Sequence, residues 1–190
     1  MRAKSRRPAR EAILRALYEI EVGRQTGPDA IADTLENSTL APELATFADE
    51  TITGILEHRS TLDRDISACL KGWELNRVAV VDRNVLRLAA YELFHVPSIP
   101  PKVTINEAVS LVKKYSTAES GRFVNGVLGA LLAKSPKAEW DPANAPSDED
   151  FAPPEPEAEV EIETIEEGSD EAAELAKSGV WQVRTKDGNA

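Results

Sequence analysis

Hydrophobic residues recur every three or four positions through most of the first 134 residues, which is the spacing of amphipathic helices. Ile13, Leu17 and Ile20 show it first, in a segment that begins near Pro8 and ends at Gly23. No segment alternates convincingly with a period of two, so we expect an all-α domain of about seven helices. The expected helices span approximately 8–22, 28–35, 42–56, 62–70, 82–96, 104–115 and 119–134.

The segment from Asp82 to Pro97 is the most apolar of these. Its hydrophobic residues, which include Val85, Leu86 and Leu93, lie on more than one helix face. A helix with several apolar faces is covered on several sides. We therefore expect residues 82–96 to form the central buried helix.

The next connection contains two prolines, Pro100 and Pro101, and is expected to be stiff. Thr104 and Glu107 follow it, three positions apart. This spacing matches a capping box, in which the two side chains bond to the first backbone amides of a helix. The pattern predicts that the following helix begins at Thr104.

Charge divides the chain into two regions. Residues 1–137 carry 19 Lys and Arg against 17 Asp and Glu, whereas residues 138–190 carry 3 against 16. In the first region, basic residues gather within the first 15 positions, opposed only by Glu11. They are Arg2, Lys4, Arg6, Arg7, Arg10 and Arg15. Such a basic arm indicates a polyanionic ligand, of which nucleic acid is the commonest.

Residues 138–190 are acidic and rich in proline, and this composition is typical of disorder. The sequence thus predicts a helical domain over 1–137 and a disordered tail over 138–190. A weak helix near 170–177 and an apolar island at Val180, Trp181 and Val183 interrupt the tail. The island could be a docking motif or an end without function.

The sequence gives no indication of catalysis. Cys69 is the single cysteine, so no internal disulfide is possible, and its apolar neighbours predict a buried position. His58 and His95 lack metal-ligand spacing, and phosphate loops and nucleophile elbows are absent. No secretory signal or membrane-spanning run is visible. We expect a cytoplasmic, non-enzymatic protein without metal or cofactor.

Three stretches of the sequence carry a family resemblance. They are residues 6–11 with 16–18, residues 82–93, and residues 99–108 with 123–128. The last two stretches contain an R-L-x-x-Y-E-L helix, an INEA segment and an FVNGVL segment. In this order and spacing, they resemble the NusB family of bacterial transcription antitermination factors. The resemblance covers roughly residues 5–134.

The resemblance implies two packed helical bundles and an RNA-binding adaptor function. Members of the family pair with NusE, a small-subunit ribosomal protein. The pair recognises the single-stranded boxA element of ribosomal RNA leaders. It then joins NusA, NusG and RNA polymerase to support processive elongation. The resemblance implies nothing about the tail.

The expected RNA surface joins the basic arm to the start of the last helix. Arginine can contact phosphate with two hydrogen bonds, and an aromatic ring can stack on a base. Phe123 is the candidate ring, although its spacing to Val127 also suits a core residue. The candidate RNA-binding residues are Arg2, Lys4, Arg6, Arg7, Arg10, Lys113, Lys114, Glu119, Arg122 and Phe123.

Some of these residues have other interpretations. Lys113 and Lys114 also complement the helix dipole, because they end a helix. Pro8 interrupts the basic run where many relatives carry a basic residue.

Tyr18 and Asp82 match family positions that face NusE. Tyr18 could instead be a core aromatic with an exposed hydroxyl, and Asp82 could be a helix N-cap. Two other functions remain open at this point. One is a protein-interaction adaptor without RNA, and the other is a relative of the RNA-binding domain of ribosomal RNA methyltransferases.

Overall fold

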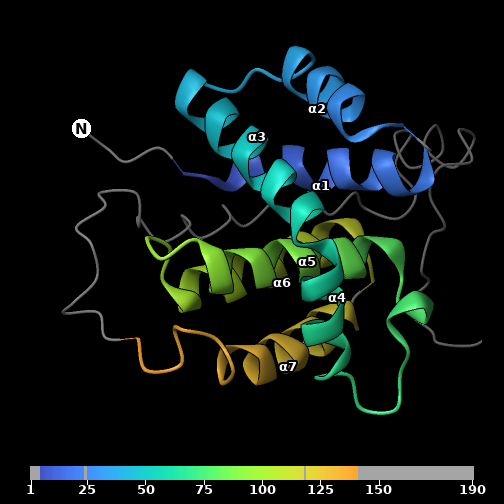
Figure 1. Cartoon of the computed structure of the whole chain (residues 1–190), viewed down its shortest axis with the longest axis vertical. Coiled ribbons are helices and arrows are strands. Elements are labelled where there is room, and N and C mark those ends of the chain that lie inside the picture. Colours follow the sequence, from blue (N-terminus) through green and yellow to red (C-terminus); the bar gives the residue numbers. More distant parts are fainter. Residues whose placement is uncertain (1–4, 24, 118, 141–190) are drawn as a thin grey trace, which may run out of the picture. The chain divides into compact units, whose positions relative to one another are not determined.

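The computed structural model describes residues 5–23, 25–117 and 119–140 (Figure 1). These residues form seven α-helices and one 3-10 helix, and none of them is in a strand. The all-α prediction is therefore confirmed. The helices are α1 (Arg7–Val22), α2 (Gly27–Glu36), α3 (Pro42–Glu57), α4 (Arg59–Ser67), α5 (Val80–His95), α6 (Pro101–Tyr115) and α7 (Ser120–Leu132), with the 3-10 helix η1 (Leu75–Arg77) before α5.

The helices pack as two groups around α5. Helices α1, α2 and α3 pack on one another, while α5 packs against α4, α6 and α7. Contacts of α5 with α1 and α3 join the groups, as Figure 1 shows. The predicted central helix is confirmed, since α5 is buried on several faces. Across the described ranges, no helix has the length and apolarity that crossing a membrane requires.

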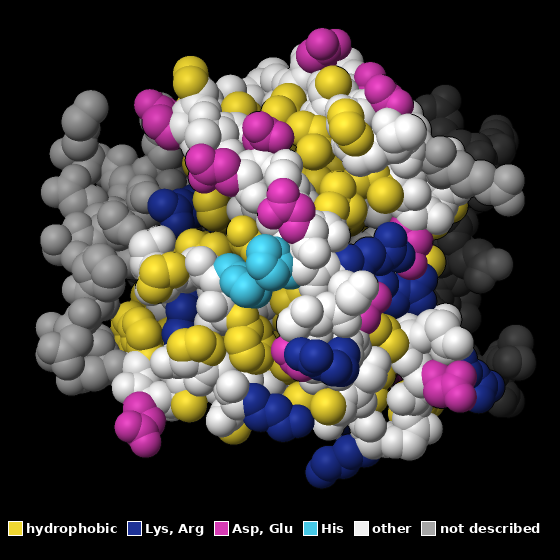
Figure 2. Space-filling model, viewed as in Figure 1, with side chains coloured by type: hydrophobic (Ala, Val, Ile, Leu, Met, Phe, Trp, Pro, Cys, Tyr) yellow, Lys and Arg dark blue, Asp and Glu magenta, His cyan; other side chains and the backbone are white. Residues whose placement is uncertain are grey.

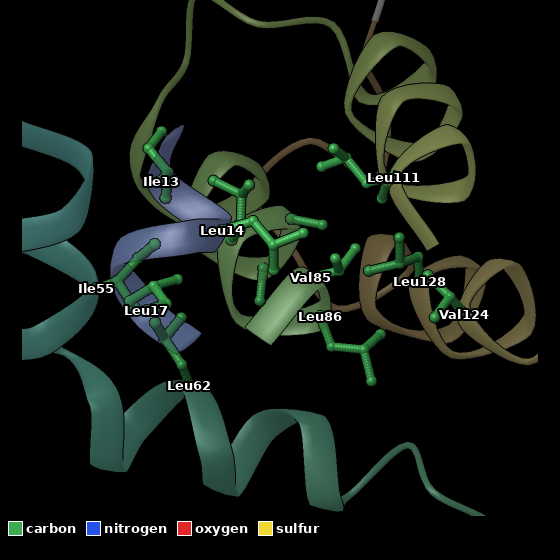
Figure 3. Close-up of a cluster of buried hydrophobic side chains, with 14 of the residues drawn as sticks. Ile13, Leu14, Leu17, Ile55, Leu62, Val85, Leu86, Leu111, Val124 and Leu128 are labelled. Carbon is green, nitrogen blue, oxygen red and sulfur yellow. The ribbon is translucent and has the colours of Figure 1, made fainter. Parts of the chain in front are cut away.

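A single apolar core connects the two groups. Figure 3 shows side chains from α1, α3, α4, α5, α6 and α7 converging on one cluster. Burial of apolar surface on this scale is the main stabilising contribution to a fold of this kind. Among the residues of this core are Ile13, Leu14, Leu17, Ile55, Leu62, Val85, Leu86, Leu111, Val124 and Leu128.

The start of α6 differs from the prediction. The helix begins at Pro101, three residues before Thr104. The Thr104 hydroxyl donates to the Glu92 carboxylate at 2.7 Å and caps no amide. Glu107 is buried as well. The capping-box prediction was therefore wrong, because both side chains face the interior one turn inside the helix.

The fourth helix lies three residues earlier than expected, at Arg59–Ser67 instead of 62–70. It ends at Ser67, so Cys69 lies in the turn that follows. Cys69 is half-buried and packs against the core, which agrees with a structural role.

Lys137 holds the segment after α7 onto the end of α5. Its Nζ donates to the carbonyls of Glu92, Val96 and Ile99 at 2.7, 2.5 and 2.6 Å. Burial lowers the pKa of Lys137 to about 8, although Glu92 acts in the opposite direction. The expected tail, with its helix and apolar island, lies outside the described residues from position 141 onward.

An ion-pair network joins the end of α1 to α5 and α4. Glu21 accepts hydrogen bonds from Arg83 at 2.5 Å and from Arg87 at 2.9 Å. Arg87 also binds both carboxylate oxygens of Asp63. Burial alone would raise the pKa of Glu21, but Arg83, Arg87 and Arg59 outweigh it and hold that pKa below its ordinary value.

Candidate nucleic-acid interface

The basic arm leads directly into α1. Arg6 precedes the helix, and its guanidinium lies 4.8 Å from the centre of the Phe47 ring on α3. Arg7 begins the helix, and its backbone amide donates to the Ser5 hydroxyl at 3.2 Å. Both side chains are half-buried. Arg2 and Lys4 lie outside the described residues.

Arg10 is a core residue, which corrects its predicted role in RNA binding. It is only 4% exposed. Its Nε and Nη2 donate to the two Glu92 oxygens at 2.8 and 3.3 Å, and the Glu107 carboxylate lies 3.9 Å from Nη1. Burial alone would lower the pKa of Arg10, but the two carboxylates raise it overall. The Arg10 guanidinium is therefore buried in the interior, where charged side chains are found almost only when they are paired.

Glu11, next along α1, ties the arm helix to the end of α6. One of its oxygens accepts from Lys114 Nζ and the other from the Tyr115 hydroxyl, both at 2.9 Å. Burial alone would raise the pKa of Glu11, but Lys114, Tyr115 and Arg7 lower it overall. The pKa of Lys114 is raised by its hydrogen bonds with Glu11 and Tyr115. Both charges therefore persist at neutral pH.

The end of α6 also lies against the start of α7. A Cβ added at Gly121 would come within 3.4 Å of Lys113 Cε, so the lysine stem lies across the first turn of α7. Glu119 and Arg122 are exposed on this turn. The fold therefore places the candidate RNA-binding residues Lys113 and Lys114 close to Glu119 and Arg122.

Phe123 is half-buried and packs against the core. This favours the core interpretation of its spacing. Its contribution to a base contact stays a prediction.

Asp82 is buried inside α5 as its third residue, so the N-cap interpretation was wrong. Its Oδ2 accepts from the Ser120 hydroxyl at 2.8 Å, and Ser120 also contacts the hydroxyls of Ser116 and Thr117. Asp82 thus fixes the turn between α6 and α7. Burial leaves little of Asp82 for a partner to contact.

Tyr18 is 43% exposed, which excludes the core alternative. It lines an open groove of about 370 Å³ between α1, α5 and the end of α6. The other lining residues are Glu11, Leu14, Arg15, Val81 and Tyr115.

Glu11 and Tyr115 are not among the site residues predicted from the sequence. Tyr115 directly follows Lys113 and Lys114, which were predicted to bind RNA, and this position in the sequence could have indicated that it belongs to the site. The pairing with Glu11 spans 104 positions, and local sequence could not indicate it.

Charged side chains are distributed unevenly over the surface. On the face in Figure 2, acidic side chains gather over α2 and α3, and the two histidines lie together near the centre. Their rings are 4.3 Å apart. Within the described part of the chain, no group of three or more His, Cys, Asp or Glu side chains is arranged to hold a metal ion.

The fold and these surfaces define a small all-helical protein that presents basic and aromatic side chains where three helix ends meet. A family model described as the NusB family matches residues 7–133, and the chain belongs to that family.

Relatives agree with this assignment. The chain is 40% identical over 136 residues to the transcription antitermination protein NusB of Symbiobacterium thermophilum, covering 67% of this chain and 89% of that protein. The NusB structure of T. maritima is 40% identical, with a TM-score of 0.68 over 72% of this chain and 96% of that one. A crystal structure of NusB and NusE in complex with dsRNA contains a chain 28% identical, with a TM-score of 0.64 over 68% of this chain and 96% of that one. The Symbiobacterium protein and the chains of the NusB–NusE structure are named for antitermination and not as enzymes.

Proposed function

We propose that this protein is a transcription antitermination factor that binds boxA-type single-stranded RNA of ribosomal RNA leaders together with the NusE ribosomal protein. Its relatives are named for antitermination, and one similar NusB chain was solved with NusE and dsRNA. The pair would join NusA, NusG and RNA polymerase in the cytoplasm.

One observation carries the RNA part of the proposal. The Glu11–Lys114 bond joins the first turns of α1 to the end of α6, and the Lys113–Gly121 approach joins that end to α7. Basic residues from three separate segments therefore form one surface. Such a surface suits the phosphates of a single strand. We assign to it Arg2, Lys4, Arg6, Arg7, Lys113, Lys114, Glu119, Arg122 and Phe123.

The NusE partner is proposed to bind around Tyr18. An exposed tyrosine beside a groove is typical of an interface centre. Asp82 is buried, so we give it an indirect role in this interface through Ser120 and the turn before α7.

The test is co-purification with the ribosomal protein, followed by a gel shift on boxA-type and scrambled RNA. We expect weak, poorly selective binding by this chain alone and tight, selective binding by the pair. Equal affinity and selectivity with and without the partner would contradict the division of labour. A protein-interaction adaptor, the rival function, would show no salt-dependent RNA binding in either form.

A further inference from the structure

We propose that the groove between α1 and the end of α6 holds a nucleobase of the bound RNA, and that Tyr115 is its stacking surface. This inference rests on the proposed RNA-binding function. It assigns the base contact to a residue other than Phe123.

Two exposed aromatic rings lie at this groove. Among the described residues, the exposed Phe, Tyr and Trp side chains are Tyr18, Trp73 and Tyr115, and two of the three line this one groove. Phe123 instead packs against the core, so much of its ring surface is already covered. Sequence-tolerant binding of single strands depends on rings that remain accessible to bases.

Tyr115 is held in place by contacts on two helices. Its backbone ends α6, and its hydroxyl donates to Glu11 Oε2 on α1 at 2.9 Å. The ring is therefore fixed at both ends before RNA arrives. A side chain that is ordered in advance loses less conformational entropy when a ligand binds.

Cationic side chains lie beside the groove. Lys114 Nζ lies 5.0 Å from the centre of the Tyr115 ring, and exposed Arg15 on α1 also lines the groove. A base in the groove would thus have two cationic side chains near its flanking phosphates, of which Lys114 is also paired with Glu11. The groove volume of about 370 Å³ lies within the range of sites that enclose small ligands, roughly 300–1,000 Å³.

The experiment compares the full-length protein with Y115L, Y115F and W73L. Trp73 is a matched control, because it is an exposed aromatic, at 61%, in the connection between α4 and η1. Fluorescence anisotropy measures binding to a labelled single-stranded RNA dodecamer and, separately, to heparin, a polyanion without bases. Circular dichroism establishes that each variant is folded.

We expect Y115L to weaken RNA binding by about 5-fold to 100-fold, the range expected when one base can no longer stack. Heparin affinity should stay within about twofold, because leucine removes no charge. Y115F keeps the ring but loses the hydroxyl bond to Glu11, so it should lose much less RNA affinity than Y115L, and W73L should match the parent.

Three results would overturn the assignment. Unchanged RNA binding by Y115L would remove the stacking contact. Equal losses for RNA and heparin would show an electrostatic or structural effect. Normal RNA affinity with weakened NusE binding would assign the groove to the protein partner. Failure of the parent protein to bind RNA, alone or with NusE, would instead refute the proposed function itself.

Discussion

Arg10 and Glu92 lie 82 positions apart and form a two-point ion pair inside the core, at 2.8 and 3.3 Å. Thr104 donates to the same carboxylate, which leaves Glu92 surrounded by donors. The pair fixes α1 against α5 directly behind the basic arm. An arginine that belongs by sequence to the arm therefore supports the arm from inside.

Removing this arginine should destabilise the protein far more than it changes the RNA surface. We expect Arg10→Met to lower the free energy of unfolding by about 3–5 kcal/mol, because Glu92 is left buried and charged. Urea denaturation measures the loss, and Arg15→Met, an exposed change on the same helix, is the control. The double variant R10M/E92M should recover part of the loss. Strictly additive losses would show that the pair is not coupled.

Neutralising the arm itself should act on RNA. Replacing Arg6 and Arg7 by Ala should flatten the slope of log K against log salt by about 0.7 for each phosphate that the arm no longer neutralises. Titrations of single-stranded RNA at several salt concentrations measure the slope. Arg64→Ala, an exposed change on α4, is the matched control. A slope equal to that of the parent would remove both arginines from the RNA site.

Tyr18→Ala should weaken binding of the ribosomal partner by about 1–3 kcal/mol, because central interface tyrosines contribute on this scale. Isothermal titration calorimetry gives the affinity. The control is Trp73→Ala, which removes a more exposed aromatic side chain at a different place on the surface. It should leave the affinity for the ribosomal partner unchanged. Full partner affinity in folded Tyr18→Ala would place the interface elsewhere.

Glu21 should make stability depend on pH in acid. Because Arg83 and Arg87 hold its folded pKa below the ordinary 4.5, the unfolded chain takes up its proton first as pH falls. The stabilisation from Glu21 is therefore complete above about pH 5 and decreases as pH falls through the folded pKa.

Urea denaturation of the parent and Glu21→Gln between pH 3 and 7 tests this behaviour. The difference between the two should be largest near neutrality, at about 1–3 kcal/mol, and should shrink in acid. Glu19→Gln, two positions away on α1, controls for a change of overall charge. A difference that does not vary with pH would exclude the ionic contribution.

Removing residues 141–190 should strengthen non-specific RNA binding at low salt. The cut takes away 15 of the 33 acidic residues but only 3 of the 22 basic ones, so less negative charge repels the RNA. It must follow Trp140, because Lys137 binds three carbonyls of the body. The gain should disappear as salt screens it. If the full-length and shortened proteins bind random RNA identically across the salt range, residues 141–190 do not affect non-specific RNA binding.

The helical fold was predictable because its signals are local. Prolines in the first turns of α1, α2 and α3 and the three-to-four spacing of apolar residues marked the helices closely. Arg10 was misassigned because it belongs to a basic run. It also lies on the apolar stripe of Ile13 and Leu17, and that position was a usable sign of burial.

Contacts between distant segments were not predictable. Tyr115 meets Glu11 across 104 positions, and His58 meets His95 only because α3 and α5 pack together. Thr104 and Glu107 had the right spacing for a cap, but the rigid prolines before them had already started the helix. In each case, tertiary packing decided the outcome.

The Arg10–Glu92 pair also sets an order of events during synthesis. A ribosome adds about 5–20 residues each second, so Glu92 emerges roughly 4–16 s after Arg10. Glu107 follows later still. Until then, the inward face of α1 has neither its carboxylates nor α5 to pack against. Although α1 leaves the ribosome before α5 and α6, it is consequently among the last helices to acquire its native surroundings, and the nascent protein gains a fully supported arm only when α6 has been made.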